Sequence, residues 1–259
     1  MLRVPKNLHR ALIVVSSVLV LGALAFGLRE ALRSPMFLVR VVEIADQPEH
    51  SPVDAQTLTA LAAIPIGVTN LFEVDLKAIE GKILTNEWVR EVSIQKRFPQ
   101  TVSISVTYRE PRALMQLESG QLSYVDGDGK VFGRVNLMFQ PDLPILTGLA
   151  HSAVPQTSQI REALRVVALW ENFDRKRKSQ LSSLHWDEER GFRALVSYRL
   201  NTGYSKTMVQ LGSDTRADLE PQFQRLERVF EYLEKNSIAA RQVFADAGKK
   251  IVVKTARGS

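Results

Sequence analysis

The stretch "EWVREVSIQKRFPQTVSISVTYREP", residues 87–111, predicts two β-strands joined by a tight turn. Its second half alternates between apolar and polar side chains, which is typical of a strand with one buried and one exposed face. The turn is expected at Phe98-Pro99-Gln100, because proline fixes φ and cannot donate to a strand ladder. The expected inward side chains are Val102, Ile104, Val106 and Tyr108, and the expected outward ones are Thr101, Ser103, Ser105 and Thr107.

The segments before this hairpin can supply the layer that covers it. Residues 37–44 are apolar and β-branched, which predicts a strand. Residues 51–64 predict a helix with Ser51 as N-cap and Pro52 in the first position, and a second short helix is expected to start at Asp75 as N-cap. The order is therefore β-α-α-β-β, so the apolar face of the hairpin is expected to bury both helices.

An uncharged apolar run, residues 11–28, precedes this domain. As a helix it spans about 27 Å, close to the thickness of the hydrocarbon core of a bilayer. Two interpretations are open: an uncleaved single-pass anchor, or a signal peptide with a cleavage site at Ala23-Leu24-Ala25. The length of the run, and Arg29 and Arg33 directly after it, favour the anchor. Either interpretation puts residues 34–259 outside the cytoplasm.

The net charge of +6 is concentrated around the apolar run. Residues 1–33 carry five basic side chains and one acidic one, a net +4, which leaves +2 for the rest of the chain. A nucleic-acid-binding protein would be expected to gather its basic residues on a folded face. The distribution therefore favours a membrane protein. The absence of cysteine excludes disulfides, thiolate metal sites and a cysteine nucleophile.

Residues 111–255 predict a second domain, a mixed β-sheet with two helices, so the fold class is α+β. A hairpin is expected around Asp126-Gly127-Asp128-Gly129, and two short strands around Asp246-Ala247-Gly248 at the end. Strands are also expected at 181–186, 192–200 and 206–211, and helices from about Ser158 and over 221–235. The expected inward residues are Ile160, Ala163, Leu164, Val167 and Ala168, then Phe192, Ala194, Val196 and Tyr198, then Phe223, Leu226, Val229, Phe230 and Leu233.

The last predicted strand, "KIVVKT" at 250–255, has three apolar residues in succession, Ile251, Val252 and Val253. Successive residues of a strand point to opposite faces, so this strand is apolar on both faces. One interpretation is a strand buried between its sheet and a helix. The other is an open edge that a second protein extends by adding its own strand.

We expect no catalytic residue, no cofactor and no metal site. The four histidines are scattered without zinc-ligand spacing, and neither a nucleophile elbow nor a P-loop is present. A calcium loop starting at Asp126 would need acids at Lys130 and Leu137. The acidic cluster Asp187-Glu188-Glu189 precedes Arg190-Gly191 and is interpreted as a solvated turn.

The β-α-α-β-β order resembles a POTRA domain. Asn70-Leu71-Phe72 before the second helix, and the apolar run that precedes the whole domain, strengthen the resemblance. With "YVDGDGKVF" (124–132) and "LPILTG" (143–148), the chain resembles the FtsQ/DivIB family of bacterial cell-division proteins. Two segments depart from the family pattern. "ADQPEHS" (45–51) replaces a frequent Gly-Asn turn, and Val243 is followed by Phe244-Ala245-Asp246 where the family often has Asp-x-Arg.

The resemblance implies a cytoplasmic tail (1–10), a transmembrane helix (11–28), a POTRA domain (35–110), a β domain (111–255) and a short tail (256–259). It implies a non-enzymatic scaffold in the inner cell membrane, enriched at the division septum, that helps control septal peptidoglycan synthesis. The β domain would receive a strand from FtsB, the coiled-coil partner of FtsL. The matching residues here are Ile251, Val252, Val253, Lys254 and Thr255.

Two other classes of function remain open. POTRA-like modules also precede outer-membrane barrels, so a transport component is one alternative. A barrel needs at least eight alternating strands of about ten residues, and the length after Pro111 does not supply them alongside two helices. An envelope enzyme is the other alternative, and activity on peptidoglycan or peptide substrates would identify it. Neither a nucleic acid nor a small-molecule substrate is expected.

Overall fold

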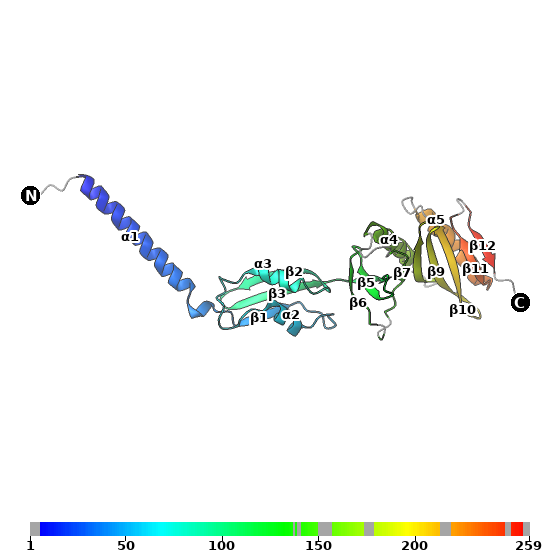
Figure 1. Cartoon of the computed structure of the whole chain (residues 1–259), viewed down its shortest axis with the longest axis horizontal. Coiled ribbons are helices and arrows are strands. Elements are labelled where there is room, and N and C mark those ends of the chain that lie inside the picture. Colours follow the sequence, from blue (N-terminus) through cyan, green and yellow to red (C-terminus); the bar gives the residue numbers. More distant parts are fainter. Residues whose placement is uncertain are drawn as a thin grey trace, which may run out of the picture. The chain divides into compact units, whose positions relative to one another are not determined.

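The computed structural model describes residues 6–136, 138, 141–149, 157–173, 179–212, 219–246 and 250–255. The chain divides into two compact units, residues 1–109 and 110–259. Figure 1 colours them from blue to cyan-green and from green to red.

The first unit begins with α1 (Lys6–Leu32). Its segment Val15–Leu32 is long and apolar enough to cross a bilayer once, and none of it is buried in the structure. The helix continues beyond the uncharged run, since the backbone N–H of Arg33 still donates to the carbonyl of Arg29 at 3.1 Å. By length and composition α1 therefore fits a single-pass membrane helix.

The rest of the first unit has the β-α-α-β-β order, which confirms the sequence prediction. Its sheet has the strand order β1-β3-β2, with β1 parallel and β2 antiparallel to the central strand. The two helices and the apolar face of the hairpin share one core. The elements are β1 (Val41–Ala45), α2 (Ala55–Ala62), α3 (Leu76–Ile83), β2 (Val89–Arg97) and β3 (Thr101–Tyr108).

Two predicted boundaries in this unit were wrong. The cap of α2 is Asp54, whose side chain accepts from the backbone N–H of Thr57 at 2.7 Å. Ser51 lies in the preceding turn and donates to the carbonyl of Val53, which is buried. The first strand begins at Val41 rather than residue 37, because residues 35–37 form the short 3₁₀ helix η1 (Pro35–Phe37), with proline at its start.

The predicted cap of α3 is confirmed, since Asp75 accepts from the N–H of Ala78. The predicted alternation of β3 holds for Val102 and Ile104, which are fully buried. Ser103 was expected on the exposed face, but it is only 4% exposed. The reason is that β3 is the central strand, so β1 and β2 cover it from both sides.

The second unit is built on a nine-stranded mixed sheet with the order β12-β11-β10-β9-β8-β7-β4-β5-β6. The pairs β4–β7, β7–β8 and β10–β11 are parallel, and the other pairs are antiparallel. The strands are β4 (Pro111–Gln116), β5 (Leu122–Asp126), β6 (Val131–Arg134), β7 (Ile145–Thr147), β8 (Ser179–Asp187), β9 (Gly191–Leu200), β10 (Gly203–Gly212), β11 (Ala240–Phe244) and β12 (Val252–Thr255).

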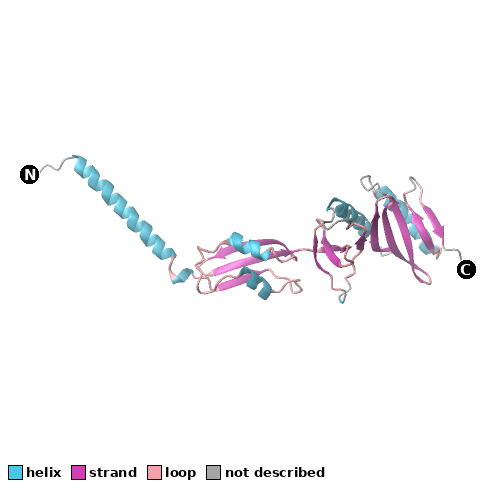
Figure 2. Cartoon of the chain, in the orientation of Figure 1, coloured by secondary structure: helices cyan, strands magenta, loops and turns pink. Residues whose placement is uncertain are grey.

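Two helices, α4 (Thr157–Phe173) and α5 (Glu220–Lys235), pack on one face of this sheet (Figure 2). Trp170 of α4 is 1% exposed and lies edge-on to the rings of Phe223 and Phe230, at 5.5 and 6.3 Å between centroids. The predicted inward residues of β9 are all fully buried: Phe192, Ala194, Val196 and Tyr198.

One predicted core residue of α4 was wrong. Ala168 is exposed, and the side chain of Trp170 occupies the core instead. Tyr198 joins β9 to the start of β11. Its hydroxyl donates to the carbonyl of Ile238 at 3.0 Å and accepts from the N–H of Ala240 at 2.7 Å. This pair of hydrogen bonds fixes where β11 enters the sheet.

Candidate partner-binding edge of the second unit

β12 is an edge strand of the nine-stranded sheet, at the red end of the chain in Figure 1. Within the described residues its one strand partner is β11, to which it runs antiparallel. In such a pair about half of the backbone N–H and C=O groups of the outer strand point away from the sheet. Among the residues that the structure describes, no strand pairs with the outer side of β12, so these outward backbone groups are available to a further strand.

The two faces of β12 differ in burial. Val253 lies opposite Val243, which is fully buried, and both Val253 and Ile251 pack against the core. Val252 points to the other face and is 48% exposed. The strand is therefore packed on one face only, and its extension by a second protein stays a prediction. One face holds the strand to the domain, and the other presents an apolar side chain to solvent.

Phe244 of β11 extends this outward face. It lies directly opposite Val252 in the strand register. The ammonium group of Lys254 lies 5.2 Å from the centroid of the Phe244 ring, within the range of a cation–π contact. We call Ile251–Thr255 together with Phe244 the β12 edge. Its outward face combines an apolar pair with one positive charge.

The neighbouring backbone holds the β12 edge in place. The side-chain amide of Gln222, on α5, donates to the carbonyls of Ala245 at 2.8 Å and Leu211 at 3.2 Å. The N–H of Ala245 donates to the carbonyl of Gln210 at 2.8 Å. The end of β11 is thus fastened both to β10 and to the helix behind the sheet, so β12 pairs with a fixed strand.

The structure brings all five sequence-predicted partner residues to one edge. Val252–Thr255 form β12, and Ile251 directly precedes it. Phe244 was not among the partner residues predicted from the sequence. A signal was present, since Phe244 lies between the apolar Val243 and Ala245, and alternation along a strand places it on the other face. Residues Ala247 and Gly248, where a turn was predicted, lie outside the described residues.

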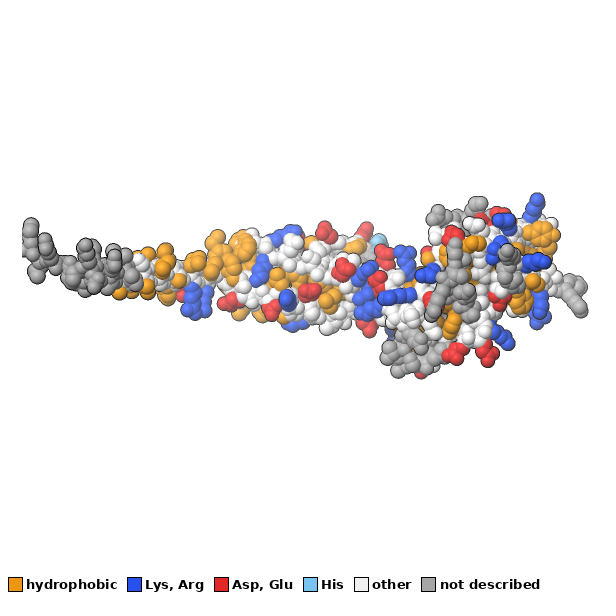
Figure 3. Space-filling model, turned by 90° about the horizontal axis from the view of Figure 1, so that it is seen from above, with side chains coloured by type: hydrophobic (Ala, Val, Ile, Leu, Met, Phe, Trp, Pro, Cys, Tyr) orange, Lys and Arg blue, Asp and Glu red, His pale blue; other side chains and the backbone are white. Residues whose placement is uncertain are grey.

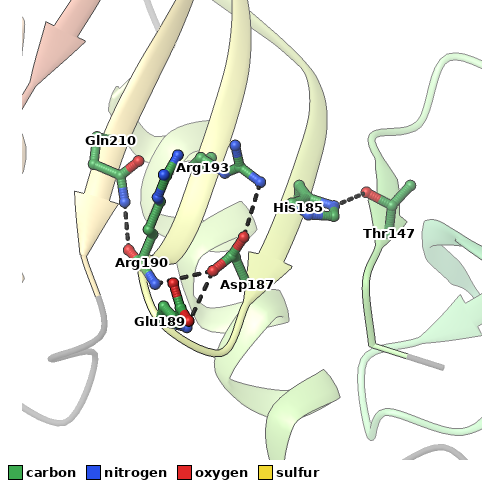
Figure 4. A network of polar contacts seen from close by, with 7 residues as sticks. All are labelled: Thr147, His185, Asp187, Glu189, Arg190, Arg193 and Gln210. Atoms are coloured by element: carbon green, nitrogen blue, oxygen red, sulfur yellow. Dashed lines mark hydrogen bonds and ion pairs between the residues drawn. The ribbon is translucent and has the colours of Figure 1, made fainter. Parts of the chain in front are cut away.

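The acidic cluster after β8 forms a turn, as predicted (Figure 4). One carboxylate oxygen of Asp187 accepts from the backbone N–H groups of Glu189 and Arg190 at 3.0 Å, and the other accepts from Arg193 at 3.2 Å. The hydrogen bond from the backbone of Arg190 is the main cause that lowers the pKa of Asp187. Gln210 then donates to the carbonyl of Arg190. These contacts stabilise the β8–β9 turn, so the carboxylate of Asp187 has a structural role there.

The remaining polar motifs also hold elements together. The side chains of Thr147 and His185 are hydrogen-bonded at 2.9 Å between β7 and β8 (Figure 4). Asp126 accepts from the N–H groups of Asp128 at 3.0 Å and Lys130 at 2.9 Å, which closes the β5–β6 turn. Across the described parts of the chain, no group of three histidine, aspartate or glutamate side chains is placed to hold a metal ion.

Comparison with known proteins identifies both units. Residues 49–109 match the family model "POTRA domain, FtsQ-type", and residues 113–245 match "Cell division protein FtsQ/DivIB, C-terminal". The second match ends before β12, so the role of that strand is argued from its geometry.

Several curated relatives are named cell division protein FtsQ. The protein of Myxococcus fulvus is 33% identical over 246 residues, which cover 92% of this chain and 81% of the relative. The proteins of Geotalea daltonii and Syntrophotalea carbinolica are each 25% identical, over 90% and 93% of this chain and 82% of each relative. The resemblance seen in the sequence is thereby confirmed: the chain belongs to the FtsQ/DivIB family of bacterial cell-division proteins.

Proposed function

We propose that the protein is a non-enzymatic scaffold of the divisome that binds FtsB/FtsL-type membrane partners through the β12 edge. The observation that carries this proposal is the geometry of β12. It is an edge strand whose inward face is packed and whose outward Val252 is 48% exposed beside Phe244. Family membership favours this role over a transport component or an envelope enzyme.

Binding would occur by strand addition. A partner strand pairs with the outward N–H and C=O groups of residues 252–255, and its alternate side chains contact Val252 and Phe244. A strand of four residues offers few main-chain hydrogen bonds, and each contributes only about 0.5–1.5 kcal/mol net. The apolar pair and Lys254 must therefore supply a large part of the affinity and the choice of partner.

Membrane attachment completes the proposal. With α1 as a single-pass anchor in the inner cell membrane, the N-terminal tail lies in the cytoplasm and both units lie outside it. Anchoring confines the search for membrane-bound partners to two dimensions, which raises their effective concentration. The POTRA domain contributes to recruitment. The assembled scaffold is enriched at the septum, links early and late division proteins, and helps control septal peptidoglycan synthesis by partner enzymes.

Calorimetric titration tests this proposal directly. The whole chain in lipid nanodiscs is titrated with the outer segments of FtsB- and FtsL-like partners. Two variants, Val252→Pro and Val253→Pro, are compared, because neighbouring N–H groups of a strand point in opposite directions. The proline at the position whose N–H points toward β11 removes a hydrogen bond within the domain and lowers the unfolding midpoint. The proline at the position whose N–H points outward removes one donor to the partner strand, and we expect it to weaken binding about tenfold while the domain stays folded.

Arg134→Pro is the matched control, since Arg134 is exposed on β6, the opposite edge of the same sheet. We expect this variant to bind the partner as the native chain does. If a folded β12 proline variant and the native chain bind equally well, the site lies elsewhere. If the native chain binds neither segment, the scaffold proposal itself is wrong.

A further inference from the structure

An exposed aromatic cluster lies at one end of the first unit. Phe98, at the tip of the β2–β3 turn, is 59% exposed, and Phe72, in the loop before α3, is 40% exposed. The ring of Phe72 contacts those of Phe37 and Phe98, with centroids 5.0 and 5.2 Å apart. Met36, next to Phe37, is 60% exposed. We call Met36, Phe37, Phe72 and Phe98 the Phe72 cluster.

The Phe72 cluster is tied to the end of α1. Asn70 is buried, and its side-chain amide donates to the carbonyl of Leu32, the last residue of α1, at 2.8 Å. The amide oxygen of the same side chain accepts from the N–H of Phe72 at 2.9 Å. Gln100, beyond the hairpin turn, donates to the carbonyl of Met36 at 3.1 Å. Three segments of the unit thus present apolar side chains directly where the membrane-spanning helix ends.

Basic side chains surround this cluster. Arg29 lies in the last turn of α1 and Arg33 directly follows the helix. The ammonium group of Lys96 donates to the carbonyl of Phe72 at 3.1 Å, so a positive charge is fixed beside the aromatic rings. Arg97 pairs with Glu43 at 3.1 Å, and Glu73 adds a negative charge in the same loop as Phe72. Figure 3 shows hydrophobic and basic side chains together at this end of the unit.

A hollow of about 410 Å³ lies between the last turns of α1 and the loop that carries Phe72. Its walls are mostly apolar, and the polar side chains that also line it are Arg29, Arg33, Asn70 and Glu73, so two basic groups face one acidic group. An acyl chain beside the helix matches such walls, and guanidinium groups match the phosphate of a lipid headgroup. The apolar side chains that line the hollow are Ala25, Leu28, Leu32 and Phe72.

We infer that the Phe72 cluster docks on the bilayer surface, with Phe72 and Phe98 at the boundary of headgroups and acyl chains. Phenylalanine side chains insert into this boundary on the apolar face of interfacial elements, and lysine and arginine beside them are attracted to anionic lipids. Exposed apolar patches usually mark an interaction site. Because Asn70 fastens the cluster to the end of α1, the lipid surface is already adjacent. The inference rests on α1 being the membrane anchor and is independent of the β12 edge.

Site-directed spin labelling tests the inference, because the chain has no cysteine to remove. A nitroxide is attached at Phe98→Cys in the whole chain, which is reconstituted in nanodiscs of phosphatidylcholine and phosphatidylglycerol. The matched control is Thr107→Cys, an exposed position near the opposite end of the same hairpin. We expect the accessibility of a water-soluble nickel chelate to be several-fold lower at 98 than at 107, and that of oxygen to be higher.

A second substitution, Phe72→Asp, makes the test specific to the cluster. A carboxylate opposes insertion, so the label at 98 should regain nickel accessibility while co-elution with the nanodiscs shows that α1 is still inserted. If the label at 98 is as accessible to nickel as the label at 107 in protein that co-elutes with the discs, docking on lipid is refuted. The Phe72 cluster would then be interpreted as a contact site for a protein partner.

Discussion

Two adjacent valines in β12 point to opposite faces of the sheet, so mutations there can change partner binding and domain stability independently. Val252 faces outward and is 48% exposed, whereas Val253 is partly buried and packs against the core. Full burial of a valine side chain contributes about 1.5–3 kcal/mol. A partner that covers the exposed half of Val252 therefore gains about 1 kcal/mol from it. We expect Val252→Ala to weaken binding about fivefold and to leave stability nearly unchanged.

Val253→Ala should have the reverse effect. It removes methyl groups that pack against the core, so it should lower the free energy of unfolding by about 1 kcal/mol. Its direct effect on binding should be small. Titration calorimetry measures the affinities, and chemical denaturation followed by tryptophan fluorescence measures stability. This signal is weighted toward the second unit, which contains Trp170 and Trp186. If Val252→Ala binds normally and Val253→Ala weakens binding at full stability, the assigned faces are wrong.

Three further predictions concern stability. Trp170→Ala should lower the free energy of unfolding of the second unit by about 3–5 kcal/mol, measured by denaturation, because it empties a site between Phe223 and Phe230. Gly148→Ala should prevent stable folding, because its Cβ would lie 2.1 Å from the carbonyl oxygen of Trp186. Gly120→Ala has a similar positive φ but open space around it, so it should cost only the backbone strain of about 1–2 kcal/mol and lower the melting temperature by a few degrees. Asp187 has a pKa below the usual 3.8, so its contribution to stability is complete above that pH and is lost on acidification through the lower value of the folded state. The melting temperature of Asp187→Asn should accordingly fall less on acidification than that of the native chain.

The order of strands and helices in the first unit was predictable, because the residues that set each element lie close together in the sequence. The alternation in β3, the proline in the turn and Asp75 as a cap each act within a few residues. The errors arose where tertiary contacts decide. Asp54 caps α2, whereas the hydroxyl of Ser51 donates to the carbonyl of the buried Val53 in the segment before the helix. Ser103 is buried because β1 and β2 pair on both sides of its strand.

The candidate site was predictable in part for the same reason. Three successive apolar residues indicated an unusual last strand, but its place at the edge depends on a parallel β10–β11 pair that is connected through α5. The spatial order of these strands cannot be predicted from a short stretch of sequence. The Phe72 cluster is less predictable still, because its rings come from η1, the loop before α3 and the hairpin turn. The three rings come into contact only when the unit is folded.

Hydrogen exchange at the backbone of β12 tests strand addition most directly. The exchange of the amides of residues 251–255 is measured by mass spectrometry in the whole chain, with and without a saturating FtsB-like outer segment. Strand addition predicts slower exchange there on binding, with no change in β6 at the opposite edge. Saturated binding that leaves the exchange of residues 251–255 unchanged would show that the partner does not pair with this strand.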